Sequence, residues 1–154
     1  MKSYRTRKSG FTLVEILIVV IILGILAAIV IPQFTNASQD ARESSLRSQL
    51  QSMRSQIALY KLQHRDEPPQ LITDGWDVMT NCTDESGTVS TATDPTIPDA
   101  TFKFGPYFEN PVVNPLANSS TVAATAAPAV GWVYSETTGV ISATSDADGT
   151  AFTE

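Results

Sequence analysis

Residues 11–31 read FTLVEILIVVIILGILAAIVI, and this apolar stretch decides how the chain is organised. Its only charged residue is Glu15. As an α-helix the stretch would be about 31 Å long at roughly 1.5 Å per residue, which is close to the hydrocarbon thickness of a bilayer. We therefore predict a membrane-spanning helix. A cleaved secretory signal is the alternative, but its apolar region is usually only about 7–15 residues long and here it would contain a carboxylate.

The charge of the 154-residue chain is distributed unevenly along the sequence. Residues 1–10 carry +4, residues 11–32 carry −1, residues 33–65 carry +3 and residues 66–154 carry −12. A basic segment before an apolar helix predicts a cytoplasmic N-terminus and a body on the other side of the membrane. The net charge of −6 argues against sequence-independent binding to nucleic acid phosphates, so no nucleic acid partner is predicted.

The apolar helix is expected to continue past Pro32 as an amphipathic helix. Proline removes a backbone donor and kinks a helix, but a regular apolar stripe resumes beyond it. Pro68-Pro69 is expected to end the helix near residue 65, because the residue before a proline is disfavoured in the α region. The stripe follows a spacing of three and four residues and consists of Leu46, Leu50, Met53, Ile57, Tyr60 and His64.

Beyond residue 68 the sequence predicts a small β-rich body. Residues 73–101 show no period and are interpreted as a long loop, and short extended runs follow near residues 101–104, 112–113 and 120–124. The best strand pair is 130–135 with 140–143, joined by a loop that contains Gly139. These strands need an apolar partner, which the helix stripe provides. The predicted fold class is α+β, with a long helix packed on a small antiparallel sheet.

The sequence around the start of the apolar helix resembles a known processing signal. Lys8-Ser9-Gly10-Phe11-Thr12-Leu13-Val14-Glu15 joins a basic leader to glycine, phenylalanine and a carboxylate inside an apolar helix. This pattern is similar to the class III signal of type IV prepilins and pseudopilins, and the similarity extends through Ile31-Pro32 to about residue 65. The resemblance implies a pilin-like fold and a structural role in a filament rather than an enzymatic one.

The same resemblance implies a maturation pathway and a set of partners. A prepilin peptidase and N-methyltransferase would cut after Gly10 and methylate the new amine of Phe11. The mature protein would assemble with copies of itself, with minor pseudopilins and with an inner-membrane assembly platform. Before assembly its helix would be surrounded by membrane lipid. It would be a single-pass protein of the inner membrane, with a cytoplasmic N-terminus and a periplasmic head.

These expectations divide the chain into four segments. Residues 1–10 are a leader removed on maturation, residues 11–32 are the transmembrane and filament-core helix, residues 33–67 continue it as an amphipathic helix, and residues 68–154 form the acidic head.

Glu15 has a physical argument of its own. A carboxylate near the centre of a spanning helix costs about 2.5–3.5 kcal/mol on insertion scales, so its presence calls for a reason. Cutting after Gly10 places Glu15 near a helix N-terminus, where the helix dipole partly offsets that cost. The α-amine created at Phe11 in a neighbouring copy is a partner with which the carboxylate can pair in lipid. The alternative is that Glu15 only reaches the interface by tilt or by water access.

Catalytic chemistry finds little support in the sequence. The chain has one histidine, His64, which lies on the apolar stripe and is interpreted as a packing residue or a helix cap. The one cysteine, Cys82, excludes an intramolecular disulfide and a zinc site built on several cysteines. We predict no enzyme and no tightly bound cofactor.

Calcium is the one cofactor for which a pattern exists. Asp146-Ala147-Asp148-Gly149 resembles the opening of a calcium loop, with Asp146 and Asp148 as candidate ligands, but the terminal bidentate glutamate is absent. A solvated acidic tail is the favoured alternative.

Within the family, the sequence favours one type of subunit. A single cysteine cannot close the C-terminal disulfide loop that type IV pilins usually carry, and Gly105-Pro106-Tyr107 is similar to turns of the major pseudopilins of type II secretion systems. The prediction is a major pseudopilin acting in type II protein secretion. A type IV pilus subunit for adhesion, motility or DNA uptake, and a membrane-anchored binding domain, remain the alternatives.

Overall fold

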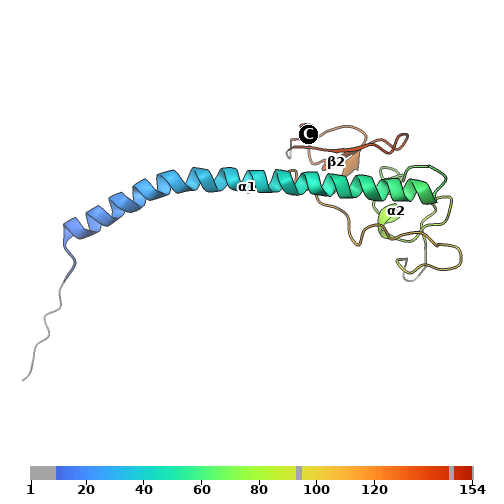
Figure 1. Cartoon of the computed structure of the whole chain (residues 1–154), viewed down its shortest axis with the longest axis horizontal. Helices are drawn as coiled ribbons and strands as arrows, with labels where there is room; N and C mark the ends of the chain where they lie inside the picture. The colour runs from blue at the N-terminus through green and yellow to red at the C-terminus, as the bar shows by residue number, and fades with distance from the viewer. Residues whose placement is uncertain (1–9, 93–94, 146–147, 154) are drawn as a thin grey trace, which may run out of the picture. The chain divides into compact units, whose positions relative to one another are not determined.

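The computed structural model describes residues 10–92, 95–145 and 148–153. The chain divides into two compact units, Met1–Asp40 and Ala41–Glu154, and one long helix contributes to both, so each unit is described by itself. The elements along the chain (Figure 1) are α1 (Leu13–Gln63), α2 (Asp77–Thr80), β1 (Val122–Ala123), β2 (Trp132–Tyr134) and β3 (Ile141–Ala143).

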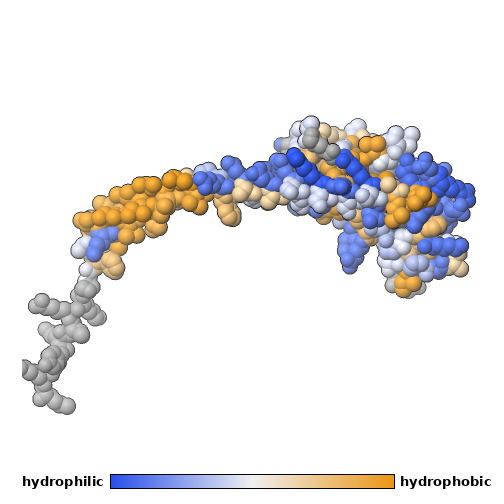
Figure 2. All heavy atoms as spheres, viewed as in Figure 1, coloured by the Kyte–Doolittle hydropathy of each residue, from blue (hydrophilic) through white to orange (hydrophobic). Residues whose placement is uncertain are grey.

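In the first unit, the α1 residues before Ala41 have no apolar partner within the unit. All described residues from Gly10 to Asp40 are exposed, and Figure 2 shows an almost unbroken apolar surface over the early turns of the helix. Among the described residues, α1 is the one helix long and apolar enough to cross a membrane. The helix continues through Pro32, which confirms that this proline does not separate two helices.

In the second unit, α1 buries the predicted stripe against the sheet. Between Ala41 and Gln63 only one face of the helix is buried, because apolar residues recur there at helical spacing and polar residues occupy the other positions. The β2–β3 hairpin supplies the other side of the core. The buried residues shared by the helix and the hairpin are Leu46, Leu50, Met53, Ile57, Tyr60, Trp132, Tyr134, Ile141 and Ala143.

The α+β class is confirmed, but the sheet is mixed rather than antiparallel. Its strand order is β1-β2-β3, with β2 antiparallel to β3, as the hairpin predicted, and β1 parallel to β2. A parallel neighbour usually needs a long crossover. Here β1 has two residues, so the chain has little distance to retrace, and residues 124–131 suffice to return it to the start of β2.

Three other local expectations differ from the structure. Residues 101–104 and 112–113 form no strand, although Phe104 makes an isolated bridge to Thr83. The loop predicted over 73–101 contains α2. The helix ends at Gln63, because Arg65 adopts a left-handed φ of 58° and the amide of Asp66 donates to the Lys61 carbonyl at 2.8 Å, the bond pattern that closes a helix C-terminus.

A buried amide joins the loop before the sheet to two of its strand ends. Asn114 has no exposed surface, and its Nδ2 donates to the carbonyls of Gly131 and Thr144 at 2.8 and 2.9 Å. Its Oδ1 accepts hydrogen bonds from the backbone N–H groups of Leu116 and Ala117. Since the amide is satisfied on both sides, it holds residues 114–117 in place without leaving a buried polar group unpaired.

Candidate functional site

The predicted processing junction lies just before α1 begins. Gly10 and Phe11 are exposed and lie outside the helix, and 84% of the Phe11 surface is accessible. A side chain built at Gly10 would meet nothing within 4 Å, so the structure around the glycine leaves the peptide bond between the two residues open. A peptidase needs such a segment, because it must bind the backbone in an extended form that a helix does not offer.

Thr12 and Glu15 form a reciprocal cap at the start of α1. The Glu15 carboxylate accepts hydrogen bonds from the backbone N–H and the hydroxyl of Thr12, both at 2.8 Å. In return, the Thr12 Oγ1 accepts the backbone N–H of Glu15 at 3.2 Å. This is the capping box, in which two helix-end donors are satisfied by side chains three residues apart.

The capping box stabilises the Glu15 carboxylate within its own chain, which helps to explain why a charged residue is present in an apolar segment. One carboxylate oxygen is engaged by Thr12, so the carboxylate does not depend on a second chain for every hydrogen bond. The helix dipole near Glu15 is predictable from the sequence, whereas Thr12 as the hydrogen-bond partner of Glu15 is a finding of the structure. The signal was present, since Thr-x-x-Glu before an apolar run is itself the signature of a capping box.

The candidate calcium ligands are only partly described. Asp146 lies outside the described residues, while Asp148 lies within them and next to Gly149, which adopts a left-handed φ of 87° against the Ala127 backbone. Among the described residues, no group of three histidine, cysteine, aspartate or glutamate side chains is placed to hold a metal. The calcium site therefore stays a hypothesis that rests on the sequence.

His64 is a buried packing residue, as the stripe predicted. It is 2% exposed and stacks on the Tyr60 ring at 3.7 Å between centroids. Its Nδ1 lies 2.8 Å from the Tyr60 carbonyl and its Nε2 lies 2.9 Å from the Thr83 Oγ1. Both ring nitrogens are thus engaged within the protein, which leaves neither to bind a substrate. Cys82 is also fully buried.

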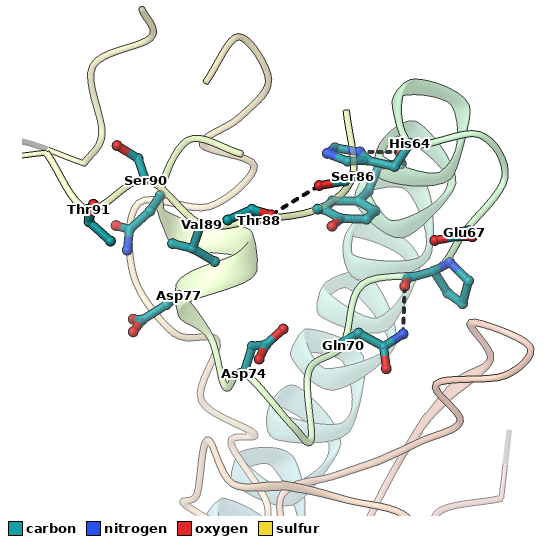
Figure 3. A pocket seen from close by; sticks show the side chains of 14 residues that line it. His64, Glu67, Gln70, Asp74, Asp77, Ser86, Thr88, Val89, Ser90 and Thr91 are labelled. Carbon is teal, nitrogen blue, oxygen red and sulfur yellow. Dashed lines mark hydrogen bonds between the residues drawn. The ribbon is translucent and has the colours of Figure 1, made fainter. Parts of the chain in front are cut away.

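A cavity of about 600 Å³ lies beside this histidine, at the end of α1. Figure 3 shows Glu67 on one side of it, after the helix end, and Asp74 and Asp77 on the other, before and at the start of α2. The segment from Ser86 to Thr91 closes a further side. Sequence reasoning did not find this cavity, because its walls come from segments without regular periodicity.

Comparison with known proteins identifies the N-terminal signal. Residues 5–31 match the model of the prokaryotic N-terminal methylation motif. The chain is 41% identical over 58 residues to the type II secretion system core protein G of Pseudomonas aeruginosa. The matched stretch makes up 38% of this chain and 41% of that protein. The corresponding protein of Dickeya chrysanthemi is 37% identical over 62 residues, or 40% of each chain. The predicted resemblance to type IV prepilins and pseudopilins is therefore confirmed over the N-terminal region.

One further relative matches over a longer stretch. The type IV major fimbrial protein FimA of Dichelobacter nodosus is 37% identical over 92 residues, which is 60% of this chain and 56% of that protein. The chain thus matches about two fifths of the length of the core protein G relatives and rather more of FimA. No solved structure matches the chain.

Proposed function

We propose that the protein is a structural subunit of a pilus-like filament, assembled from the inner membrane, and that it serves as the major pseudopilin of a type II secretion system rather than as an enzyme. The observation that carries the proposal is the junction at Gly10–Phe11, followed by the capped Glu15 and an exposed apolar helix. The methylation motif and the core protein G relatives support it, since both coincide with this segment.

Maturation follows from the same segment. A prepilin peptidase cuts between Gly10 and Phe11 at the cytoplasmic face, and the new amine of Phe11 is methylated. The amine has a reference pKa of about 7.7–8.0 and is largely protonated at neutral pH. Methylation keeps its charge, so a cation is left four residues before Glu15.

Assembly uses that cation. The carboxylate and the amine of a neighbouring subunit each leave water, and pairing them offsets a desolvation cost that neither offsets alone. Apolar contacts along residues 16–31 supply most of the packing but fix the register poorly, because they repeat. A subunit displaced by one helical turn, about 5.4 Å, would leave both charges unpaired.

Each subunit offers an amine to one neighbour and a carboxylate to another. Such a heterologous contact grows a helical filament when the rotation does not close into a ring. In this proposal the head lies on the periplasmic side, and minor pseudopilins and an inner-membrane assembly platform start and drive the growth.

A type IV pilus subunit is the second candidate function. The match to FimA favours it, since that match covers 60% of this chain against 38% for the core protein G of P. aeruginosa. The two candidates share processing and assembly but differ in what depends on the filament.

Deletion of the gene separates the candidates. Loss of protein export with surface fibres and motility intact supports the pseudopilin, and the reverse supports the pilus subunit. Mass spectrometry of the purified protein tests the shared part. A mature N-terminus at Phe11 carrying one methyl group is expected. An N-terminus at Met1, or one near Ala28 such as cleavage of a secretory signal would leave, would contradict the proposal.

A further inference from the structure

The cavity at the end of α1 is negatively charged and lacks a cation in its wall. Glu67, Asp74 and Asp77 line it, and none of its lining residues is a lysine or an arginine. In the part of the chain that the structure describes, these three carboxylates have no ion-pair partner within 4.0 Å; the closest basic residue in sequence, Arg65, donates instead to Glu85 at 2.8 Å. The cavity therefore carries an uncompensated negative charge.

A tyrosine hydroxyl in the cavity wall has no hydrogen-bond partner among the described residues. Tyr60 is 3% exposed, and its Oη lies against Gly87, where an added Cβ would approach it to 2.7 Å. No hydrogen bond to this hydroxyl is formed by the described residues, although both Tyr60 and Gly87 line the cavity. Burial is the main cause that raises the pKa of Tyr60, and Tyr107, Asp74 and Glu67 add to it, so the group stays a neutral phenol at physiological pH. Its oxygen is available to accept a hydrogen bond.

These groups suit an organic cation better than a metal ion. No three carboxylates of the described chain converge closely enough to ligate one ion, and the cavity is far larger than a single ion requires. A guanidinium or ammonium group on a flexible side chain can reach separated carboxylates, because it presents several N–H donors.

Two cations of the described residues, Arg42 and Lys103, are exposed and form no ion pair. Of these two, Arg42 carries the guanidinium, whose N–H donors can reach separated carboxylates. Arg47 stacks over the Phe152 ring, Lys61 pairs with Asp66 and Arg54 donates to the Ile141 carbonyl. Arg42, by contrast, is exposed on α1, and no described residue pairs with its guanidinium. Within the second unit it lies 21 residues before Gln63, the last residue of α1, which is about 32 Å at roughly 1.5 Å per residue. It therefore cannot reach the cavity of its own chain.

We propose that the cavity bounded by Glu67, Asp74 and Asp77 binds the Arg42 guanidinium of a second copy of this chain. This proposal rests on the proposed filament function. The contact joins the Arg42 end of the second unit in one copy to the cavity end of the second unit in another copy. It can therefore repeat along a filament axis. The contact also reduces the electrostatic repulsion between neighbouring copies. Residues 66–154 carry −12 and repel the same residues of a neighbour, whereas residues 41–65 carry +4 and attract them. The contact weakens as salt rises, because its charges are partly exposed.

Disulfide trapping tests the contact in cells that express the full-length chain with its assembly proteins. Arg42→Cys and Asp74→Cys are placed in one chain, oxidised and separated on a non-reducing gel. A ladder of cross-linked copies is expected. The matched control pairs Arg42→Cys with Asp99→Cys, an exposed carboxylate outside the cavity, and should give none. Native Cys82 is fully buried and is present in every sample as the background.

A charge swap gives an independent readout. Arg42→Asp alone and Asp74→Arg alone should each lower the yield of sheared filaments several-fold, and the double variant should restore most of it. Lys103→Asp makes the same charge change at an exposed site outside the cavity and should leave the yield unchanged. Normal filaments from both single variants, or filaments that give no 42–74 ladder, overturn the inference and leave the filament function standing. A wild-type chain that never forms filaments overturns the filament function itself.

Discussion

The two parts of α1 are one continuous helix in two different environments. Before Ala41 every described residue is exposed, and apolar residues occupy all sides of the helix from Leu13 to Ile31. Beyond Ala41 a single stripe is buried against the protein's own sheet. Leu17 and Leu50 show the contrast, with 52% and 1% of their surfaces accessible. An all-round apolar helix is stable only when lipid or other helices cover it. The first part therefore depends on what lies outside the chain, and the second does not.

Glu15→Val should have the largest effect, a loss of filaments, because Glu15 lies in the part of α1 that depends on other chains. The variant should insert and be cut after Gly10 but form almost no filaments, since removing one partner of a desolvated pair costs about 3–5 kcal/mol. Sheared filaments are quantified by immunoblotting, with Asp40→Val, an exposed carboxylate on the same helix, as the control. Filaments from Glu15→Val at wild-type yield would show that the carboxylate has another role.

Leu50→Ala should destabilise the second unit without affecting the first. The side chain is 1% exposed, and truncating a buried leucine costs about 2–5 kcal/mol in the free energy of unfolding. Urea denaturation of the full chain in detergent measures the change. Leu62→Ala, at a position 82% exposed on the same helix, should change the midpoint little, and equal shifts for both variants would contradict the packing described here.

Asn114→Ala should destabilise the second unit about as much as Leu50→Ala. It removes the side-chain partner of the Thr144 carbonyl and of the backbone N–H groups of residues 116 and 117, at about 1–3 kcal/mol per buried unsatisfied group, whereas the Gly131 carbonyl still accepts the backbone N–H of Thr144. Asn110→Ala, at an exposed position, is the control for the loss of an amide. A midpoint that is unchanged in the Asn114 variant would mean that the loop is held by other contacts.

Thr12→Val should fray the start of α1. Loss of the capping hydroxyl costs about 1 kcal/mol, and Thr12→Ser should retain most of the cap. Hydrogen exchange at the backbone amides of Glu15 and Ile16, which donate to the Thr12 hydroxyl and carbonyl, measures the effect. Thr35→Val, which removes a hydroxyl that donates to the Ile31 carbonyl inside the helix, should leave those amides protected.

Acid should weaken the second unit slightly through Asp99. Hydrogen bonds from the backbone N–H groups of Phe102 and Thr101 hold the pKa of this carboxyl below its usual range. A depressed pKa contributes stability above the unfolded value of about 3.9, and that stability is lost as the pH falls through the folded value. Asp99→Ala should flatten this part of the pH profile of the melting temperature. An unchanged slope below pH 4 would exclude the contribution.

The sequence predicted the elements whose signals are local or strictly periodic. The apolar run and the spacing of Leu46, Leu50 and Met53 predicted a long helix with one buried face, and alternation around Trp132 predicted the β2–β3 hairpin. The N-terminal methylation motif is readable for the same reason, because its residues are consecutive. Cleavage between Gly10 and Phe11 stays a prediction. The Thr12–Glu15 cap has an equally local signal, Thr-x-x-Glu, but the charge of Glu15 alone does not predict it.

Contacts between distant segments were decided by the tertiary structure alone. The parallel pairing of β1 involves two residues, too few to show a period, and the bonds of Asn114 to strand ends 17 and 30 residues away leave no trace in the sequence around it. The acidic cavity likewise forms only when the end of α1, α2 and residues 86–91 come together. Periodicity reports which face of an element is buried, whereas the partner of each buried polar group depends on how the whole chain packs.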